Sequence, residues 1–150
     1  MILDKVLITN SFEETQRAGF EFARLHLCEG AILTRIRLVA LYGDLGSGKT
    51  AFAQGMAAGL GIKRRIISPT FIIVRKYELR IRNFYHIDLY RVQSERDFEA
   101  LGIEEILNDE KSIVIVEWAE KLGSLLPEKR WEIGFEYLDE ETRKITINKI

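Results

Sequence analysis

Residues 43–50 read Gly-Asp-Leu-Gly-Ser-Gly-Lys-Thr, which has the G-x-x-x-x-G-K-[ST] spacing of a P-loop. The glycines let the backbone turn its N–H groups inward toward a phosphate, and a helix starting there adds unpaired N–H groups and the positive end of its dipole. In such loops the lysine, here Lys49, reaches the β and γ phosphates, and the Thr50 hydroxyl is placed to ligate magnesium. The alternative is a glycine-rich turn with an incidental lysine.

The flanks of this segment favour the P-loop. Residues 37–42 form an apolar run typical of a buried parallel strand. After the loop, Phe52, Met56 and Leu60 recur at helical spacing up to Gly61, which is a suitable helix end. The sequence therefore predicts a strand, a phosphate-binding loop and a helix in succession.

The rest of the chain alternates between strand and helix patterns. Ser11 and Glu14 form a capping box that opens a helix with Ala18, Phe22 and Leu25 on one face, ended by Gly30. The other expected elements are a strand at 5–9, a hairpin of 71–79 against 84–87, a helical stretch from Ser94 interrupted at Gly102, a strand at 112–117, and a hairpin of 131–137 with 143–150. These patterns predict an α/β fold, a P-loop NTPase-like three-layer sandwich whose mixed sheet is parallel around the P-loop and antiparallel where the hairpins attach.

Length and composition narrow the class of protein. At 150 residues, the chain is expected to form a single domain spanning 1–150. A net charge of −1 does not favour a broad basic face for nucleic acid, and Cys28, the only cysteine, excludes an intrachain disulfide. Because there is no signal-peptide pattern and no apolar run long enough to span a bilayer, we expect a cytoplasmic protein without a membrane partner.

Two acids end predicted strands and are candidates for a magnesium site. Glu117 follows four β-branched residues, and Asp88 follows the strand that contains His86. Magnesium that bridges nucleotide phosphates takes oxygen ligands, so these carboxylates can hold the metal's water shell and orient the attacking water. A strand-end acid can also be only solvated or helix-capping. His86 should share a sheet face with Asp88, either as a structural core histidine or as a catalytic group.

Missing motifs indicate the nucleotide. The sequence has neither the Asp-x-x-Gly after the P-loop nor the Asn-Lys-x-Asp with which a GTPase reads guanine, so we expect ATP. The segment 68–70, Ser-Pro-Thr, is placed to fold over the γ-phosphate or to form an ordinary turn before a strand.

Taken together, four segments resemble the TsaE family, the ATPases of bacterial threonylcarbamoyladenosine synthesis on tRNA. They are the P-loop at 43–50, Ser-Pro-Thr-Phe at 68–71, His-Ile-Asp-Leu-Tyr-Arg at 86–91, and Val-Glu-Trp at 116–118. The sequence departs from the family pattern at Ala51, where a second threonine is expected, and at Ala119, where proline is frequent.

The resemblance implies partners, cofactors and residue roles. It implies action beside the TsaB and TsaD proteins, which transfer the threonylcarbamoyl group to tRNA, so that tRNA is met only through the complex. It implies ATP and Mg²⁺ as cofactors, Lys49, Asp88 and Glu117 as catalytic residues, and Thr50, Asp88 and Glu117 as metal-site residues. The implied nucleotide contacts are Asp44, Leu45, Gly46, Ser47, Gly48, Lys49, Thr50, Ala51 and Thr70, with Ser11 and Arg143 toward the nucleotide's far end. Trp118 is a candidate for either a partner interface or core packing.

Two other functions fit the same motifs. A small-molecule kinase would use Asp88 as the base that accepts a substrate hydroxyl proton, but it should also carry an arginine-rich lid, and only Arg91 and Arg96 lie between Asp88 and Glu117. A non-enzymatic module would use ATP only to set a conformation.

Overall fold

The computed structural model describes residues 5–28, 36–63, 66, 73–80 and 82–150. Seven strands form one sheet in the order β1-β7-β6-β2-β5-β4-β3. Parallel pairing joins β2 to β5 and β6 and joins β4 to β5, whereas the β3/β4, β6/β7 and β1/β7 pairs are antiparallel. The strands are β1 (Lys5–Thr9), β2 (Leu38–Tyr42), β3 (Val74–Glu78), β4 (Asn83–Asp88), β5 (Ser112–Glu117), β6 (Trp131–Tyr137) and β7 (Arg143–Lys149). The predicted mixed sheet is therefore confirmed.

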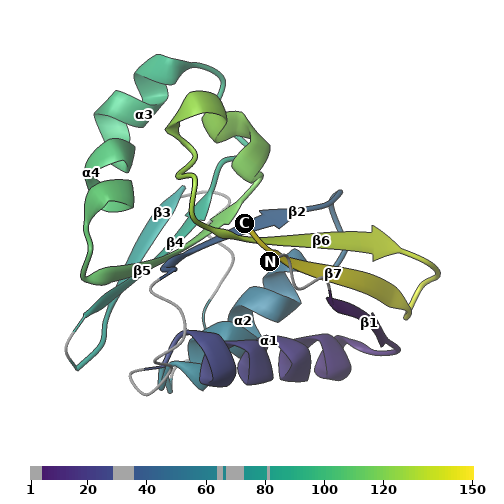
Figure 1. The fold of residues 1–150 in the computed structure, drawn as a ribbon. Helices are drawn as coiled ribbons and strands as arrows, with labels where there is room; N and C mark the ends of the chain where they lie inside the picture. Colours follow the sequence, from purple (N-terminus) through teal and green to yellow (C-terminus); the bar gives the residue numbers. More distant parts are fainter. Residues whose placement is uncertain (1–4, 29–35, 64–65, 67–72, 81) are drawn as a thin grey trace.

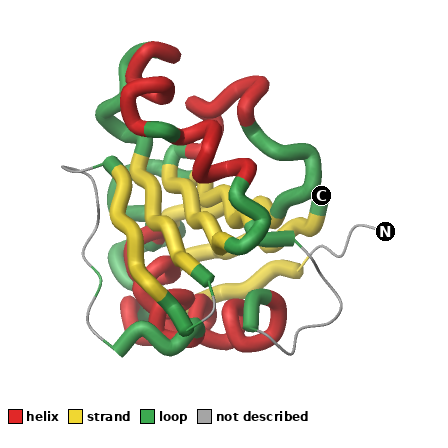
Figure 2. Tube along the Cα trace, turned by 90° about the vertical axis from the view of Figure 1, so that its left-hand side faces the viewer, coloured by secondary structure: helices red, strands yellow, loops and turns green. Residues whose placement is uncertain are grey.

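Helices cover both faces of this sheet, as a three-layer sandwich requires (Figures 1 and 2). One layer contains α1 (Phe12–His26) and α2 (Lys49–Gly59). The other contains α3 (Glu95–Leu101), α4 (Ile103–Asn108) and the 3₁₀ helix η1 (Ala119–Leu125). No helix in the described part of the chain is both long and apolar enough to cross a bilayer.

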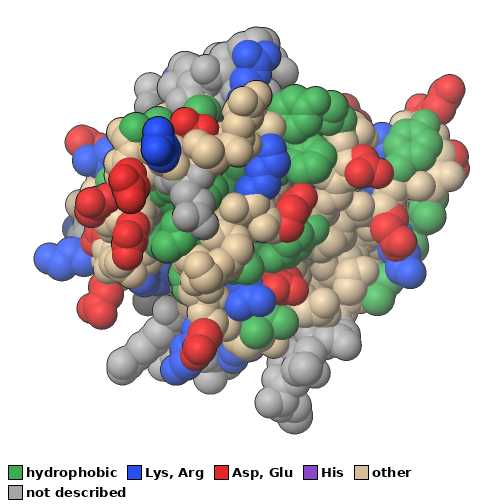
Figure 3. All heavy atoms as spheres, turned by 90° about the horizontal axis from the view of Figure 1, so that it is seen from above, with side chains coloured by type: hydrophobic (Ala, Val, Ile, Leu, Met, Phe, Trp, Pro, Cys, Tyr) green, Lys and Arg blue, Asp and Glu red, His purple; other side chains and the backbone are tan. Residues whose placement is uncertain are grey.

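Each face of the sheet packs against its own apolar core. Phe52 and Met56 of α2 belong to the core shared with α1, and Ile103 and Leu107 of α4 belong to the other. Every residue of β5 is buried, as expected for a central strand with helices on both sides. On the face drawn in Figure 3, acidic and basic side chains are interspersed among the described residues, in keeping with the near-neutral charge.

The first helix differs from its prediction. Phe22 is buried as expected, but Leu25 is 66% exposed, and the buried residues are Thr15, Gly19, Phe22 and Ala23. The reason is a close crossing with α2: a Cβ built on Gly19 would lie 2.1 Å from the carbonyl oxygen of Phe52, and one on Gly55 would lie 1.8 Å from that of Gln16. Small residues face the neighbouring helix because the two backbones nearly touch.

Other element ends were predicted more closely. Helix α1 ends at His26, before the predicted Gly30, which lies outside the described residues. Leu60 caps α2 and Gly61 follows with a φ of 94°, in keeping with the predicted glycine end. Strand β3 begins at Val74, so the predicted hairpin is shorter within the described residues. Helix η1 was not predicted.

Candidate functional site

The carboxyl ends of three parallel strands bring the predicted site residues together. Glu117, the last residue of β5, lies opposite Leu41 of β2 on one side and Asp88 of β4 on the other. The 43–50 loop begins one residue after β2 ends. In open α/β sheets, ligands bind outside this edge, so the topology places the loop and both acids where a ligand is expected.

The backbone of the 43–50 loop depends on its glycines. Gly43, Gly46 and Gly48 have φ values of 148°, 77° and 110°. A Cβ on Gly43 would also lie 2.6 Å from Ser47 Oγ and 2.8 Å from the carbonyl oxygen of Phe135. Only glycine fits this position without a shift of the neighbouring strand β6.

The loop leaves donors available at the start of α2. Gly48 caps the helix without a side-chain hydrogen bond, so no side-chain oxygen occupies the first-turn N–H groups. The hydroxyl of Ser47 is buried and has no hydrogen-bond partner among the described residues. Unpaired N–H groups at a helix N-terminus and an orphaned buried hydroxyl are the features expected of a phosphate cradle.

Lys49 lies under this loop. It is 5% exposed, and its Nζ donates to the carbonyl oxygen of Asp44 at 3.0 Å and to that of Gly43. The same Nζ lies 4.4 Å from the centroid of the Trp118 ring. Burial lowers the pKa of Lys49 below its ordinary value, and the negative charges of Glu117 and Asp88 oppose that shift.

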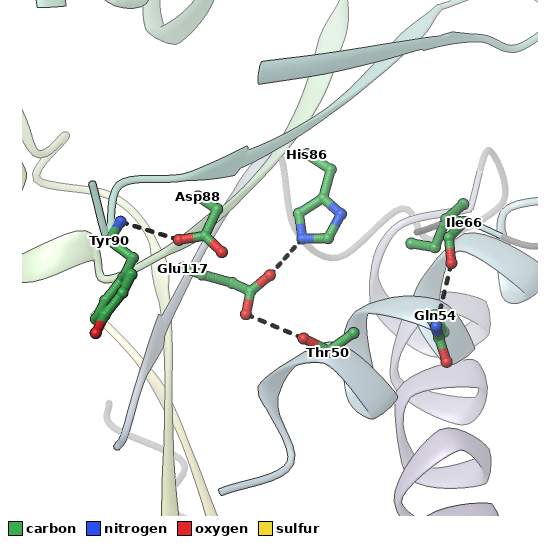
Figure 4. Close-up of polar contacts among 7 residues, drawn as sticks. All are labelled: Thr50, Gln54, Ile66, His86, Asp88, Tyr90 and Glu117. Atoms are coloured by element: carbon green, nitrogen blue, oxygen red, sulfur yellow. Dashed lines mark hydrogen bonds and ion pairs between the residues drawn. The ribbon is translucent and has the colours of Figure 1, made fainter. Parts of the chain in front are cut away.

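The acids are fixed by neighbouring groups (Figure 4). Thr50 Oγ1 lies 3.5 Å from Glu117 Oε1, and His86 Nε2 lies 2.7 Å from Glu117 Oε2. Asp88 Oδ1 accepts a hydrogen bond from the Tyr90 backbone N–H at 2.9 Å. Both carboxylates are buried, with exposures of 2% for Glu117 and 3% for Asp88.

The 43–50 loop and the two acids line one cavity of about 530 Å³, whose other walls come from the start of α1 and from the β6–β7 hairpin. Its lining includes every residue from Asp44 to Ala51, together with Asp88, Glu117, Trp118, Ser11 and Arg143. Arg143 donates to the carbonyl oxygen of Gly46 at 3.1 Å and lies over the Tyr137 ring, so the last hairpin is tied to the loop. Ser11 Oγ accepts from Glu14 N, which is one half of the predicted capping box, whereas the Glu14 carboxylate accepts from Asn10 N instead of Ser11 N; Ser11 also lines the cavity.

The oxygen donors at this cavity suit Mg²⁺, which is held partly by water and phosphate, better than they suit a metal ion whose ligands all come from the protein. Among the described residues, no group of three or more His, Cys, Asp or Glu side chains is arranged to hold a metal. Mg²⁺ in nucleotide sites takes one or two protein oxygens and completes its shell with waters and phosphate. The hydroxyl of Thr50 and the carboxylates of Glu117 and Asp88 supply oxygen donors at one wall of the cavity.

Most predicted site residues therefore lie at one cavity. Thr70 and the rest of the 68–70 segment lie outside the described residues. Ala51, where the sequence departs from the family pattern, lines the cavity, and Ala119 is fully buried. Trp118 lies at the cavity wall and also packs against the apolar core that includes α4, which agrees with the core-packing alternative; its place at a partner interface stays a prediction.

Sequence reasoning did not find two features. The first is the hydrogen bond between His86 and Glu117: alternation places His86 on the face of Asp88, but the contact depends on the register between β4 and β5. The second is the contribution to the cavity of Phe12, Glu13 and Thr15 of α1, and of Glu140 and Glu141 between β6 and β7. Ser11 was the signal available, because it starts the same helix.

Comparisons with known proteins find relatives that match most of the chain. The family model described as "Threonylcarbamoyl adenosine biosynthesis protein TsaE" matches residues 9–145. The tRNA threonylcarbamoyladenosine biosynthesis protein TsaE of Treponema pallidum is 37% identical over 93% of this chain and 97% of its own. That of Bacillus subtilis is 38% identical over 75% and 70%. The crystal structure of YdiB from Bacillus subtilis superposes with a TM-score of 0.76 and 28% identity, covering 100% of this chain and 88% of that one.

Proposed function

The chain belongs to the TsaE family of tRNA threonylcarbamoyladenosine biosynthesis, and from this premise we propose that it is the pathway's magnesium-dependent ATP-binding and ATP-hydrolysing subunit. One observation carries the proposal. The glycine-rich loop, with Lys49 and Thr50, shares a cavity wall with two buried strand-end carboxylates, Asp88 and Glu117. This is the set of groups that phosphoryl chemistry at a P-loop needs.

Each group has a role in this proposal. The loop N–H groups and Lys49 bind the phosphates, and Thr50 with the two carboxylates holds the metal and its water. When bound, Mg²⁺ would neutralise charge that develops on the phosphate oxygens. The Glu117 and Asp88 carboxylates orient the attacking water at the inner wall of the cavity.

The base is adenine in this proposal, because the guanine-reading motif is absent from the sequence. The proposal also includes a cytoplasmic location and action beside TsaB and TsaD, with tRNA reached through that complex. Among the described residues, Arg143 is the single arginine that lines the cavity, and it already binds the carbonyl oxygens of Gly46 and Asp139. Because charge stabilisation on the γ-phosphate often requires an arginine, we expect a partner surface to supply it or to order a loop.

The test is phosphate release from ATP by the purified chain, alone and with TsaB, TsaD and tRNA. We expect slow hydrolysis alone, stimulation of about 10³-fold or more by the partners, and dependence on Mg²⁺. Glu117→Gln should abolish the stimulation, whereas Glu136→Gln, a matched change on the exposed side of β6, should not. Turnover that partners leave unchanged would contradict the proposal. Phosphorylation of a small metabolite without partners would favour the kinase.

A further inference from the structure

His86 is a buried, chemically active side chain that the proposed reaction does not use directly. It is fully buried in β4 and is not among the residues that line the cavity. Within the described part of the chain, its side chain contacts Glu117, from Nε2 to Oε2 at 2.7 Å (Figure 4). Its other ring nitrogen, Nδ1, has no hydrogen-bond partner in the described part of the chain.

We propose that His86 is a positioning residue that selects the Glu117 rotamer needed at the magnesium site. This inference rests on the proposed function. An ionised carboxylate only accepts hydrogen bonds, so the ring must donate from Nε2. That bond occupies Oε2 and leaves Oε1 on the side of Thr50, 3.5 Å from its hydroxyl.

The fold makes His86 a suitable anchor. Glutamate is long and has several rotamers, whereas His86 comes from a strand held on both sides, opposite Arg75 of β3 and Ile115 of β5. Because β4 and β5 are parallel and in register, the ring of residue 86 reaches along the sheet to the residue two positions beyond its partner. Asp88 needs no such anchor, since the backbone N–H of Tyr90 holds Oδ1.

This arrangement is the one that groups behind a metal ligand commonly adopt. Such groups orient the ligand through its second polar atom, and their removal typically lowers metal affinity or activity about 10- to 100-fold. A histidine that served only to fill the core would affect stability, but it would not affect the response to Mg²⁺. The two roles are therefore separable by experiment.

The experiment compares His86→Ala, His86→Gln and His86→Asn. The amide nitrogen of glutamine reaches roughly the place of Nε2 and can donate to Glu117, whereas that of asparagine lies near Nδ1. We expect His86→Ala and His86→Asn to raise the Mg²⁺ concentration for half-maximal ATP turnover by about 10- to 100-fold, with the ATP dissociation constant much less affected. His86→Gln should restore a value near that of the parent.

A double-mutant cycle then tests whether His86 acts through Glu117. In a Glu117→Ala background, which has no side-chain acceptor for His86, His86→Ala should leave the Mg²⁺ dependence of ATP binding unchanged. The control is His26→Gln, because the other histidine lies near the opposite end of β2, beside Arg37 and Leu38. Equal effects of His86→Ala in both backgrounds, or rescue by asparagine as good as by glutamine, would overturn the inference.

The crystal structure of the His86→Ala variant gives a readout independent of turnover. We expect the Glu117 carboxylate to leave its place beside Thr50. A carboxylate that stays there would overturn the inference, even for a chain that hydrolyses no ATP. Should His86→Ala fail to fold, the same structural comparison between His86→Gln and His86→Asn decides it. A parent protein without Mg²⁺-dependent ATP binding would instead contradict the proposed function.

Discussion

Gly55→Ala should destabilise the protein through the contact between α1 and α2. A Cβ at residue 55 would lie 1.8 Å from the carbonyl oxygen of Gln16, about 1.6 Å short of the 3.4 Å at which ordinary contact begins. The obstacle is backbone, so it cannot rotate away as a side-chain end could. The helices must separate, and both contribute walls of the cavity, α1 through Phe12 and Thr15 and α2 through Lys49 and Thr50.

The magnitude follows from two opposing terms. Replacing glycine by alanine inside a helix gains about 1 kcal/mol in propensity. Overpacking costs about 1–3 kcal/mol, and we expect a cost near the upper end of this range because the atom in the way belongs to the backbone. We expect a net loss of about 2 kcal/mol, which for a chain of this length lowers the melting temperature by about 4–8 °C.

Urea unfolding followed by circular dichroism measures this loss. The control is Gly134→Ala in β6, where a Cβ would meet nothing within 4 Å and which should stabilise the protein by about 0.4–1 kcal/mol. We also expect weaker ATP binding in Gly55→Ala, measured by calorimetry on the folded protein, and parent-like binding in Gly134→Ala. A Gly55→Ala protein that unfolds at the parent's urea concentration would refute the reasoning.

Three further predictions concern the nucleotide. Lys49→Ala removes a charge-assisted phosphate contact and should weaken ATP binding by about 1.5–3 kcal/mol in calorimetry, and an unchanged dissociation constant would remove the lysine from the site. Asp88→Ala and Glu117→Ala should lower single-turnover hydrolysis far more than ATP affinity, because metal and water positioning act mainly on the transition state, and full phosphate release by both variants would contradict their roles. ATP should bind more tightly than GTP in a competitive titration, and equal affinities would show that the base is not read.

Local signals carried most of the site prediction. The P-loop pattern identifies the phosphate-binding backbone, the lysine and the hydroxyl within eight consecutive residues. The two acids can be found as soon as the strands that they end have been predicted. The sheet edge then brought Asp88 and Glu117 together, since parallel strands end at the same edge. Ser11 and Arg143, from distant segments, came from the family resemblance, because no local pattern connects them.

What could not be predicted depends on contacts between distant segments. The buried face of α1 follows the helix crossing at Gly19, so a count of apolar residues assigned Leu25 to the wrong face. The bond from His86 to Glu117 needs the β4/β5 register. Helix η1 follows Trp118, whose φ of 59° is unusual for a tryptophan, and local propensity gives no sign of such a turn.

The buried ammonium of Lys49 gives a last prediction, on pH. Burial lowers its pKa below 10.5 in the folded chain, more than Glu117 and Asp88 raise it. Between that lowered pKa and 10.5 the unfolded chain keeps a proton on Lys49 that the folded chain has lost, so the contribution of Lys49 to the free energy of unfolding rises with pH in this window. Lys49→Met has no such proton.

The difference in unfolding free energy between parent and Lys49→Met isolates this effect from the other lysines and tyrosines, which titrate in both proteins. We expect the parent to gain stability relative to the variant as pH rises toward 10.5, measured by urea unfolding at a series of pH values. Saturating ATP with Mg²⁺ should weaken the slope, because bound phosphates favour the charged lysine and raise its pKa again. If the difference in unfolding free energy between parent and Lys49→Met stays constant with pH in the absence of ATP, the folded protein stabilises the Lys49 ammonium as well as water does. The lysine would then carry no desolvation cost for the phosphates to relieve.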